Sequence, residues 1–213
     1  DAGPRLVDRS VTGFVEETAA ESPAPGGGSV SATIGALGAA LTGMVANLSS
    51  HKRGWDDRWE EFSGWAEKAK ACQEELLRLI DEDTAAFNGL MAAFGLSKGT
   101  DAEKRERDEA IQAATRKAID VPFRVMEVAL ECMATTREMA SIGLPSSVSD
   151  AGVAAVCARG AVLGAFLNVK INARGLGDGE AVSKFLSAGA SIEERAKGLE
   201  KEILGLVEAK ISG

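Results

Sequence analysis

One aspartate occurs where the spacing of the sequence places apolar side chains. Between residues 65 and 94 apolar residues recur every three or four positions, and Asp83 takes the inward position between Leu79 and Phe87. A carboxylate withdrawn from water has a raised pKa unless it is paired, so Asp83 needs a partner or a wet cleft. In a cleft it can act as a general base. A buried ion pair or a helix-capping contact is the alternative.

A glycine-rich segment is the second candidate. Gly26, Gly27, Gly28 and Ser29 open an apolar run of small residues. A Walker phosphate loop needs a lysine after its last glycine, and a dinucleotide fingerprint needs a preceding strand, so neither pattern fits. Two interpretations stay open: a turn with Ser29 as the helix N-cap, or a backbone that lets a ligand's oxygen atoms approach closely.

Polar residues on a later helix are the third candidate. Asn168 and Asn172 lie one turn apart on a face of otherwise small side chains. Paired amides can offer donors and acceptors to a flat heterocycle such as a pterin, or they can bond to a neighbouring helix. Ser149 and Asp150, at the start of the same helix, are expected to cap it.

The cations near these segments are less distinctive. Lys52 and Arg53 follow a long helix, where they suit the negative end of its dipole or can clamp an anionic tail. Lys98 lies in a charged loop and is a surface lysine by default. His51 has no neighbouring Cys or Asp cluster, so no metal site is predicted.

The elements that must position these residues are helical. Strand signals are nearly absent, because the chain has no Tyr and no hairpin turn between alternating apolar runs. Capping boxes at Thr100/Glu103 and Ser191/Glu194 mark two helix starts, and Pro122 either kinks a helix or opens a new one. The sequence predicts an all-α, single-domain bundle of about five to seven helices over residues 1–213. The expected helices contain residues 11–15, 29–48, 65–94, 103–119, 125–139, 151–172 and 192–206.

Composition restricts the class of protein. The formal charge is −8 and the pI is near 4.9, which argues against a nucleic-acid partner. Three cysteines without a CxxC pair suggest neither a disulfide framework nor zinc, and no secretory signal is visible, so a cytoplasmic protein is expected. The run from Ser29 to Leu48 is long enough to span a bilayer. Its small residues at Gly35, Ala39 and Gly43 favour a closely packed buried helix instead.

Three separated motifs, in matching order over almost the whole chain, resemble the cyclodeaminase/cyclohydrolase family of folate enzymes. They are "SPAPGGGSVSATIGALGAALTGMVANLS", "DEDTAAFNGLMAAFGLSKGTDAEK" and "SDAGVAAVCARGAVLGAFLNVKINARGL". The resemblance implies an all-helical homodimer, a tetrahydrofolate derivative bound in clefts at the subunit interface, and a role in one-carbon metabolism.

The resemblance also implies site residues. Asp83 and Asp150 are the candidate catalytic carboxylates. The implied substrate-binding residues are Gly26, Gly27, Gly28, Ser29, Lys52, Arg53, Lys98, Ser149, Asn168 and Asn172. The chain departs from the family where Gly143 is followed by Leu144 and Pro145 rather than by Asn, which weakens substrate contacts assigned to that turn.

The activity expected from the resemblance is hydrolysis of 5,10-methenyltetrahydrofolate to 10-formyltetrahydrofolate, with no metal and no cofactor beyond the folate. A stand-alone chain favours this activity over formimidoyltetrahydrofolate cyclodeaminase, which is often fused to a transferase domain. A non-catalytic folate-binding or scaffold protein, with Asp83 merely ion-paired, is the alternative from another class.

Overall fold

A computed structural model describes residues 5–213, and six α-helices make up most of that range. No strand occurs among the described residues, so the all-α prediction of about five to seven helices is confirmed. Three short 3₁₀ turns complete the fold: η1 (Leu6–Asp8), η2 (Asp56–Arg58) and η3 (Pro145–Ser147). The α-helices are α1 (Val11–Ala19), α2 (Gly27–Ser50), α3 (Trp59–Phe94), α4 (Asp101–Ile142), α5 (Val148–Ala173) and α6 (Gly179–Ser212).

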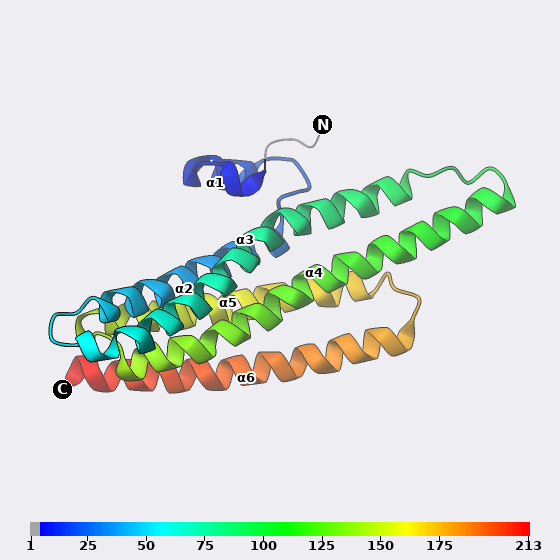
Figure 1. The fold of residues 1–213 in the computed structure, drawn as a ribbon. Coiled ribbons are helices and arrows are strands. Elements are labelled where there is room, and N and C mark those ends of the chain that lie inside the picture. Colours follow the sequence, from blue (N-terminus) through cyan, green and yellow to red (C-terminus); the bar gives the residue numbers. More distant parts are fainter. Residues whose placement is uncertain (1–4) are drawn as a thin grey trace.

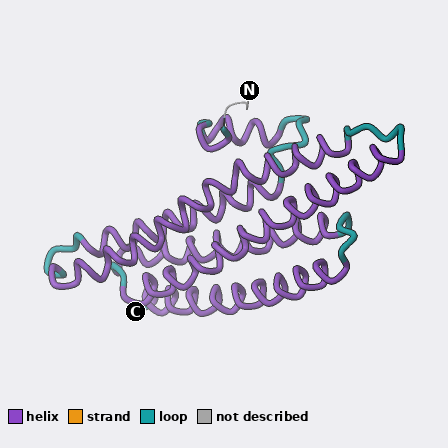
Figure 2. The backbone as a smooth tube through the Cα atoms, turned by 45° about the vertical axis from the view of Figure 1, so that its right-hand side comes forward, coloured by secondary structure: helices purple, strands orange, loops and turns teal. Residues whose placement is uncertain are grey.

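The five long helices run up and down beside one another, joined by loops at the two ends of the bundle (Figures 1 and 2). Helices α2 to α5 form a four-helix bundle in which α2 and α4 each pack against α3 and α5, and α6 covers α4 and α5. The short helix α1 lies outside the bundle (Figure 1). No described helix covers the outer side of α2 and α5.

Small residues let α2 and α5 approach closely, as the sequence predicts. A Cβ atom added to Gly38 would lie 3.0 Å from the carbonyl oxygen of Ala154, and one added to Gly35 would lie 3.2 Å from Ala161 Cβ. Larger side chains at these positions would push the helices apart. The glycines therefore fix the distance between the two helices that carry most of the candidate site.

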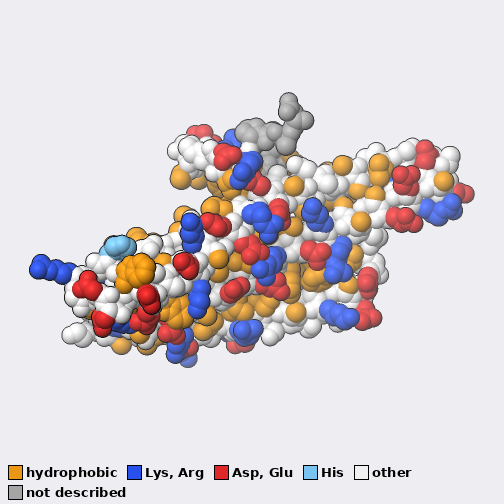
Figure 3. All heavy atoms as spheres, viewed as in Figure 1, with side chains coloured by type: hydrophobic (Ala, Val, Ile, Leu, Met, Phe, Trp, Pro, Cys, Tyr) orange, Lys and Arg blue, Asp and Glu red, His pale blue; other side chains and the backbone are white. Residues whose placement is uncertain are grey.

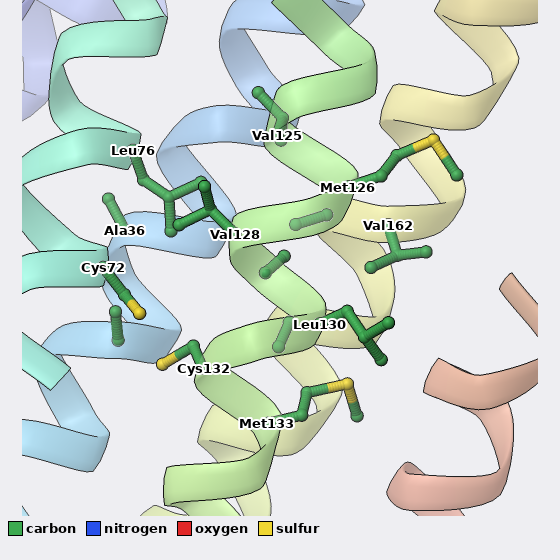
Figure 4. Close-up of a cluster of buried hydrophobic side chains, with 14 of the residues drawn as sticks. Ala36, Cys72, Leu76, Val125, Met126, Val128, Leu130, Cys132, Met133 and Val162 are labelled. Carbon is green, nitrogen blue, oxygen red and sulfur yellow. The ribbon is translucent and has the colours of Figure 1, made fainter. Parts of the chain in front are cut away.

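The core between α3 and α4 is apolar and closely packed. Leu76 of α3 meets Val128 of α4, and the Cys72 and Cys132 side chains point toward one another between the two helices (Figure 4). Leu76 is fully buried and Val128 is 1% exposed. All three cysteines are free thiols. This packing holds the middle of α3 in place, two to three turns before Asp83.

Three predicted helix starts are wrong. Helix α5 begins at Val148 after Ser147, so Ser149 and Asp150 lie within its first turn and do not cap it. Helix α2 begins at Gly27 with Gly26 as its N-cap, so Ser29 lies inside the first turn. Helix α6 begins at Gly179, where the Asp178 side chain accepts the Ala181 N–H at 3.0 Å, and not at the Ser191 capping box. The first turns of α6 were missed because they are rich in Gly, Ser and Ala and carry few large apolar residues. The Thr100 capping box is confirmed.

The apolar stripe of α3 is only partly buried. Its middle lies in the core, whereas Phe94 at its end is 47% exposed. The reason is visible in Figure 1: the end of α3 and the beginning of α4 project together past the neighbouring helices, so no other described helix covers them. The predicted inward face therefore leaves the core near Asp83.

The surface combines mixed charge with one apolar face. On the side seen in Figure 3, basic and acidic side chains are interspersed. Gly27–Ser50 and the segment Pro145–Ala173 are each long and apolar enough to cross a membrane, with 56% and 50% of their apolar windows buried in the bundle. A core helix passes this test as well as a membrane span does. The exposed apolar residues on these two helices are Leu37, Met44, Leu48, Val153, Val156, Leu163, Leu167 and Ile171.

Candidate active site

A pocket of about 300 Å³ lies where the start of α2, the middle of α3 and the end of α5 meet. This volume is at the low end of the range for ligand pockets, about 300–1,000 Å³. Asp83 is its one charged lining residue among those the structure describes. The lining residues are Pro23, Ala24, Gly26, Gly27, Gly28, Asp83, Phe87, Leu90, Ala118, Asn168, Ile171 and Asn172.

Asp83 is half-buried and has no cationic partner among the described residues. Its Oδ2 atom accepts the Ser29 hydroxyl at 2.9 Å, and the Ser29 backbone N–H bonds to the same carboxylate. Burial raises the pKa of Asp83 above its ordinary value, and the two Ser29 hydrogen bonds oppose that rise. The carboxylate thus lies at the positive end of α2 yet holds its proton more tightly than a solvated aspartate.

Gly28 leaves the space that the carboxylate occupies. A Cβ atom at this position would collide with the Asp83 side chain, whereas one at Gly27 would lie 3.1 Å from Asn168 Nδ2. The close-approach interpretation of the glycines therefore fits the structure, although the oxygen that approaches Gly28 belongs to Asp83. The first N–H groups of a helix have no carbonyl partner within that helix. The backbone N–H groups of Gly27 and Gly28 can therefore donate toward the pocket.

The two asparagines present oxygen atoms to the pocket. Asn168 Nδ2 donates to the Gly164 carbonyl at 2.9 Å, and Asn172 Nδ2 donates to the Ala118 carbonyl of α4 at 2.7 Å. Each amide has thereby used one of its two N–H groups within the protein, which leaves its second N–H and its Oδ1 available to a ligand. Together with the Asp83 carboxylate, these groups can meet a ligand edge that carries N–H groups, or a cation.

Ser29 is a predicted substrate-binding residue that the structure places behind the pocket. It is fully buried. Its hydroxyl lies 3.2 Å from both the Ile80 carbonyl and the Thr84 hydroxyl, in addition to its bond with Asp83. Ser29 therefore orients the carboxylate rather than lining the cavity.

Four other predicted residues lie at the opposite end of the bundle. Lys52 and Arg53 follow the C-terminus of α2, and Ser149 and Asp150 lie in the first turn of α5. The Leu144 N–H donates to Ser49 Oγ at 2.8 Å, which ties these two helix ends together. The 24 residues of α2 span about 36 Å. Within one chain, Asp83 and Asp150 cannot act on the same carbon atom.

Lys98 lies beyond the other side of the pocket. It is exposed in the loop that joins α3 and α4, past Phe94. The structure also assigns Phe87, Leu90 and Ile171 to the pocket wall. Phe87 and Leu90 belong to the apolar stripe that contains Asp83, and this shared face is the signal that could have identified them from sequence.

An all-helical bundle with a glycine-rich helix start against a half-buried carboxylate, faced by two amide oxygens, defines a class of small-molecule-binding helical protein. Within that class, residues 10–190 match the family described as Formiminotransferase-cyclodeaminase. The chain belongs to this cyclodeaminase/cyclohydrolase family, and the resemblance inferred from the three motifs is confirmed.

Individual relatives carry two different activities in their names. The chain is 35% identical over 212 residues to mouse formimidoyltransferase-cyclodeaminase, a match that covers 99% of the chain and 39% of the mouse protein. It is 34% identical over 205 residues to methenyltetrahydrofolate cyclohydrolase of Methylorubrum extorquens, covering 96% and 99% of the two chains. The crystal structure of formiminotetrahydrofolate cyclodeaminase from Thermotoga maritima superposes with a TM-score of 0.85 at 26% identity, covering 97% and 100%.

These matches remove one reason for preferring hydrolysis. The chain spans about two fifths of the mouse relative, but it spans the full length of both the cyclohydrolase and the Thermotoga cyclodeaminase. A chain of this length therefore occurs under both names, and length does not separate the two activities.

Proposed function

We propose that the protein hydrolyses 5,10-methenyltetrahydrofolate to 10-formyltetrahydrofolate at the Asp83 pocket, with no metal. The observation that carries the proposal is a pocket whose one charged group among the described residues is the Asp83 carboxylate, which has no cationic partner and is faced by two amide side chains. The methenyl bridge is an amidinium-like cation, and a desolvated carboxylate beside it stabilises that charge. The name of the cyclohydrolase relative, which matches 96% of the chain at 34% identity, supports the same choice.

Asp83 can serve both proton transfers of this reaction. Water adds to the carbon between N5 and N10 while Asp83 takes a proton from the water. The bond from this carbon to N5 then breaks, Asp83 returns its proton to N5, and the carbinol hydroxyl loses its proton to become the formyl carbonyl. The net reaction consumes one water and releases one proton. A raised pKa suits a group that must accept a proton and then return it near neutral pH.

The asparagines and the pocket wall hold the pterin in this scheme. The Oδ1 atoms of Asn168 and Asn172 accept hydrogen bonds from the N–H edge of the ring, and Phe87 and Leu90 cover its faces. A volume of about 300 Å³ suits the ring better than the whole folate, so the aminobenzoyl-glutamate part extends out of the pocket.

We also propose a homodimer formed by the exposed apolar face of α2 and α5. Eight large apolar side chains are exposed on these two neighbouring helices. Exposed apolar surfaces of this extent usually mark an interaction site. Ile171 lies on this face and also lines the pocket, so the pocket opens beside the proposed interface. A two-fold axis perpendicular to the helices would make α2 antiparallel to the partner's α2.

This antiparallel arrangement accounts for the two separated groups of predicted residues. It brings the Lys52 end of one chain to the Asp83 end of the other, although the two ends are about 36 Å apart within a chain. The partner's cations then face the glutamate tail as it leaves the pocket. A two-fold axis parallel to the helices would leave the cations of one chain far from the Asp83 pocket of the other.

The second candidate is formimidoyltetrahydrofolate cyclodeaminase, favoured by the names of the mouse and Thermotoga relatives. Both reactions pass through a tetrahedral carbon between two nitrogens. Two parallel assays separate them: loss of methenyl absorbance with the methenyl substrate, and ammonia release with the formimidoyl substrate. We expect turnover of the first. Ammonia release alone would replace hydrolysis by the second candidate, and turnover of neither substrate would favour a folate-binding protein without catalysis.

A further inference from the structure

We infer that Pro122 of α4 is a positioning residue for substrate, because it frees the backbone carbonyl that orients Asn172. This inference rests on the proposed folate site. Pro122 is buried inside the 42-residue helix α4, where proline is normally disfavoured. The sequence leaves open whether it kinks the helix or begins a new one, and the structure has one continuous helix through it.

The missing N–H of Pro122 has a specific partner. In an α-helix the N–H of each residue bonds to the carbonyl four residues earlier, so residue 122 would bond to the carbonyl of Ala118. Proline has no N–H, and its ring also displaces that carbonyl from the helix axis. Ala118 is buried at 7% exposure, so its carbonyl has little access to water and needs another donor.

Asn172 supplies that donor. Its Nδ2 atom lies 2.7 Å from the Ala118 oxygen, joining the end of α5 to α4 across the floor of the pocket. A flipped amide would place Oδ1 against the carbonyl oxygen, so this bond fixes which end of Asn172 faces the ligand. Asn168 differs, because its Nδ2 bonds to Gly164 on its own helix, and Pro122 has no part in it.

The inference gives a defined expectation for Pro122→Ala. The new N–H competes for the Ala118 carbonyl and restores a regular helical bond, so the protein should be at least as stable as wild type. Asn172 loses its fixed orientation, and we expect KM for the methenyl substrate to rise about 3- to 10-fold with kcat nearly unchanged. A merely structural role for Pro122 predicts the reverse pattern, with lower stability and no selective change in KM.

A double-mutant cycle tests the link to Asn172 directly. If Pro122 acts through Asn172, Pro122→Ala combined with Asn172→Ala should have the KM of Asn172→Ala alone, whereas its effect should multiply with that of Asn168→Ala. Multiplying effects in both cycles would overturn the inference. Lactic acid at position 122, the ester analogue of alanine, again lacks the N–H and should restore the wild-type KM.

A ligand-free measurement separates this inference from the proposed function. The Asn172 side-chain NH₂ signals should show slow hydrogen exchange by NMR in wild type and faster exchange in Pro122→Ala, with no folate present. Unchanged exchange would overturn the inference even in an active enzyme. Loss of protection in a protein that turns over neither substrate would keep the hydrogen-bond link and reject the proposed catalysis.

Discussion

At its N-terminal end α2 presents glycines to a half-buried carboxylate, whereas at its C-terminal end it is followed by two cations near solvent. The first end is enclosed by α3 and α5, and its polar groups are fixed by Ser29 and by backbone carbonyls. At the second end Arg53 is exposed, and Lys52 contacts the face of Trp55 at 4.2 Å. Enclosed and preorganised groups suit bond making, while cations at the surface suit a flexible anionic tail.

This contrast supports the proposal that one chain holds two incomplete halves of a site. Each half has a chemistry that the other lacks, and the separation of about 36 Å along α2 prevents one chain from joining them. The apolar face that runs along α2 and α5 connects the two ends. Variants at either end of α2, and on the face between the two ends, therefore test whether these parts act together.

The largest effect is expected at Asp83. Asp83→Asn removes the proposed base, so kcat should fall by about 10²- to 10⁴-fold. Asp120→Asn, which alters an exposed ion pair with Arg116, is the control and should retain activity. A fully active Asp83→Asn protein would exclude this residue as the base.

The same variant makes a pH-dependent prediction for stability. Burial raises the pKa of Asp83, so the folded protein binds this proton more tightly than the unfolded chain does. Its stabilising contribution is complete below the unfolded pKa of about 3.9 and is lost as pH rises through the folded pKa. Asp83→Asn should therefore gain stability over wild type at neutral pH but not in acid, as measured by urea unfolding at several pH values.

Gly28→Ala should have the next largest effect. The new Cβ collides with the Asp83 carboxylate and displaces it, which should reduce kcat/KM on the order of 10²-fold. Gly198→Ala is the matched control, because its Cβ meets open space within helix α6 and should stabilise the protein by about 0.5–1 kcal/mol. Equal activity of the two variants would contradict the role of Gly28.

A substitution on the apolar face of α2 and α5 should have a smaller effect. Leu167 is 58% exposed in the isolated chain, so Leu167→Glu should dissociate the dimer and lower turnover about 10-fold without unfolding the protomer. Met91 is 50% exposed near the end of α3, away from this face, so Met91→Glu serves as the control and should leave the dimer intact. Sedimentation equilibrium without detergent reports the assembly. A wild-type protein that needs detergent to stay in solution would point to a membrane-facing surface instead.

The smallest effect is expected at Ser29. Ser29→Ala removes one hydrogen bond to the Asp83 carboxylate, so the pKa of Asp83 should rise further. The acidic limb of the kcat/KM profile should move up by about one pH unit. Thr33→Ala, whose hydroxyl donates to the Ser29 carbonyl at 2.8 Å, should leave the limb in place. Coincident profiles for all three proteins would reject the role of Ser29.

The sequence predicts features that depend on one helix at a time. Asp83 and the pair Asn168 and Asn172 follow from spacing within α3 and α5, because a helix repeats every 3.6 residues. Local spacing does not specify which helix ends meet. The family resemblance grouped Lys52 and Asp150 with Asp83, and the order of the motifs could not reveal that these residues occupy opposite ends of the bundle.

Contacts between different helices could not be predicted from the sequence either. The role of Ser29 as a hidden support for Asp83 depends on α2 crossing α3, and the bond from Asn172 to Ala118 depends on α5 meeting α4 beside Pro122. The start of α6 at Gly179 was missed for a different reason, since its first turns have few large apolar residues to mark a buried face.

The central claim, that each site combines the two ends of α2 from different subunits, is best tested by complementation. One protein carries Asp83→Asn, and a second carries Lys52→Glu with Arg53→Glu. The first should lack turnover, and the second should have a KM raised so far that little turnover remains at substrate concentrations near the wild-type KM. After mixing and subunit exchange, half of the dimers are mixed and each has one intact site of two, so about a quarter of wild-type activity should return. No recovery, despite mixed dimers detected by mass spectrometry, would contradict the account.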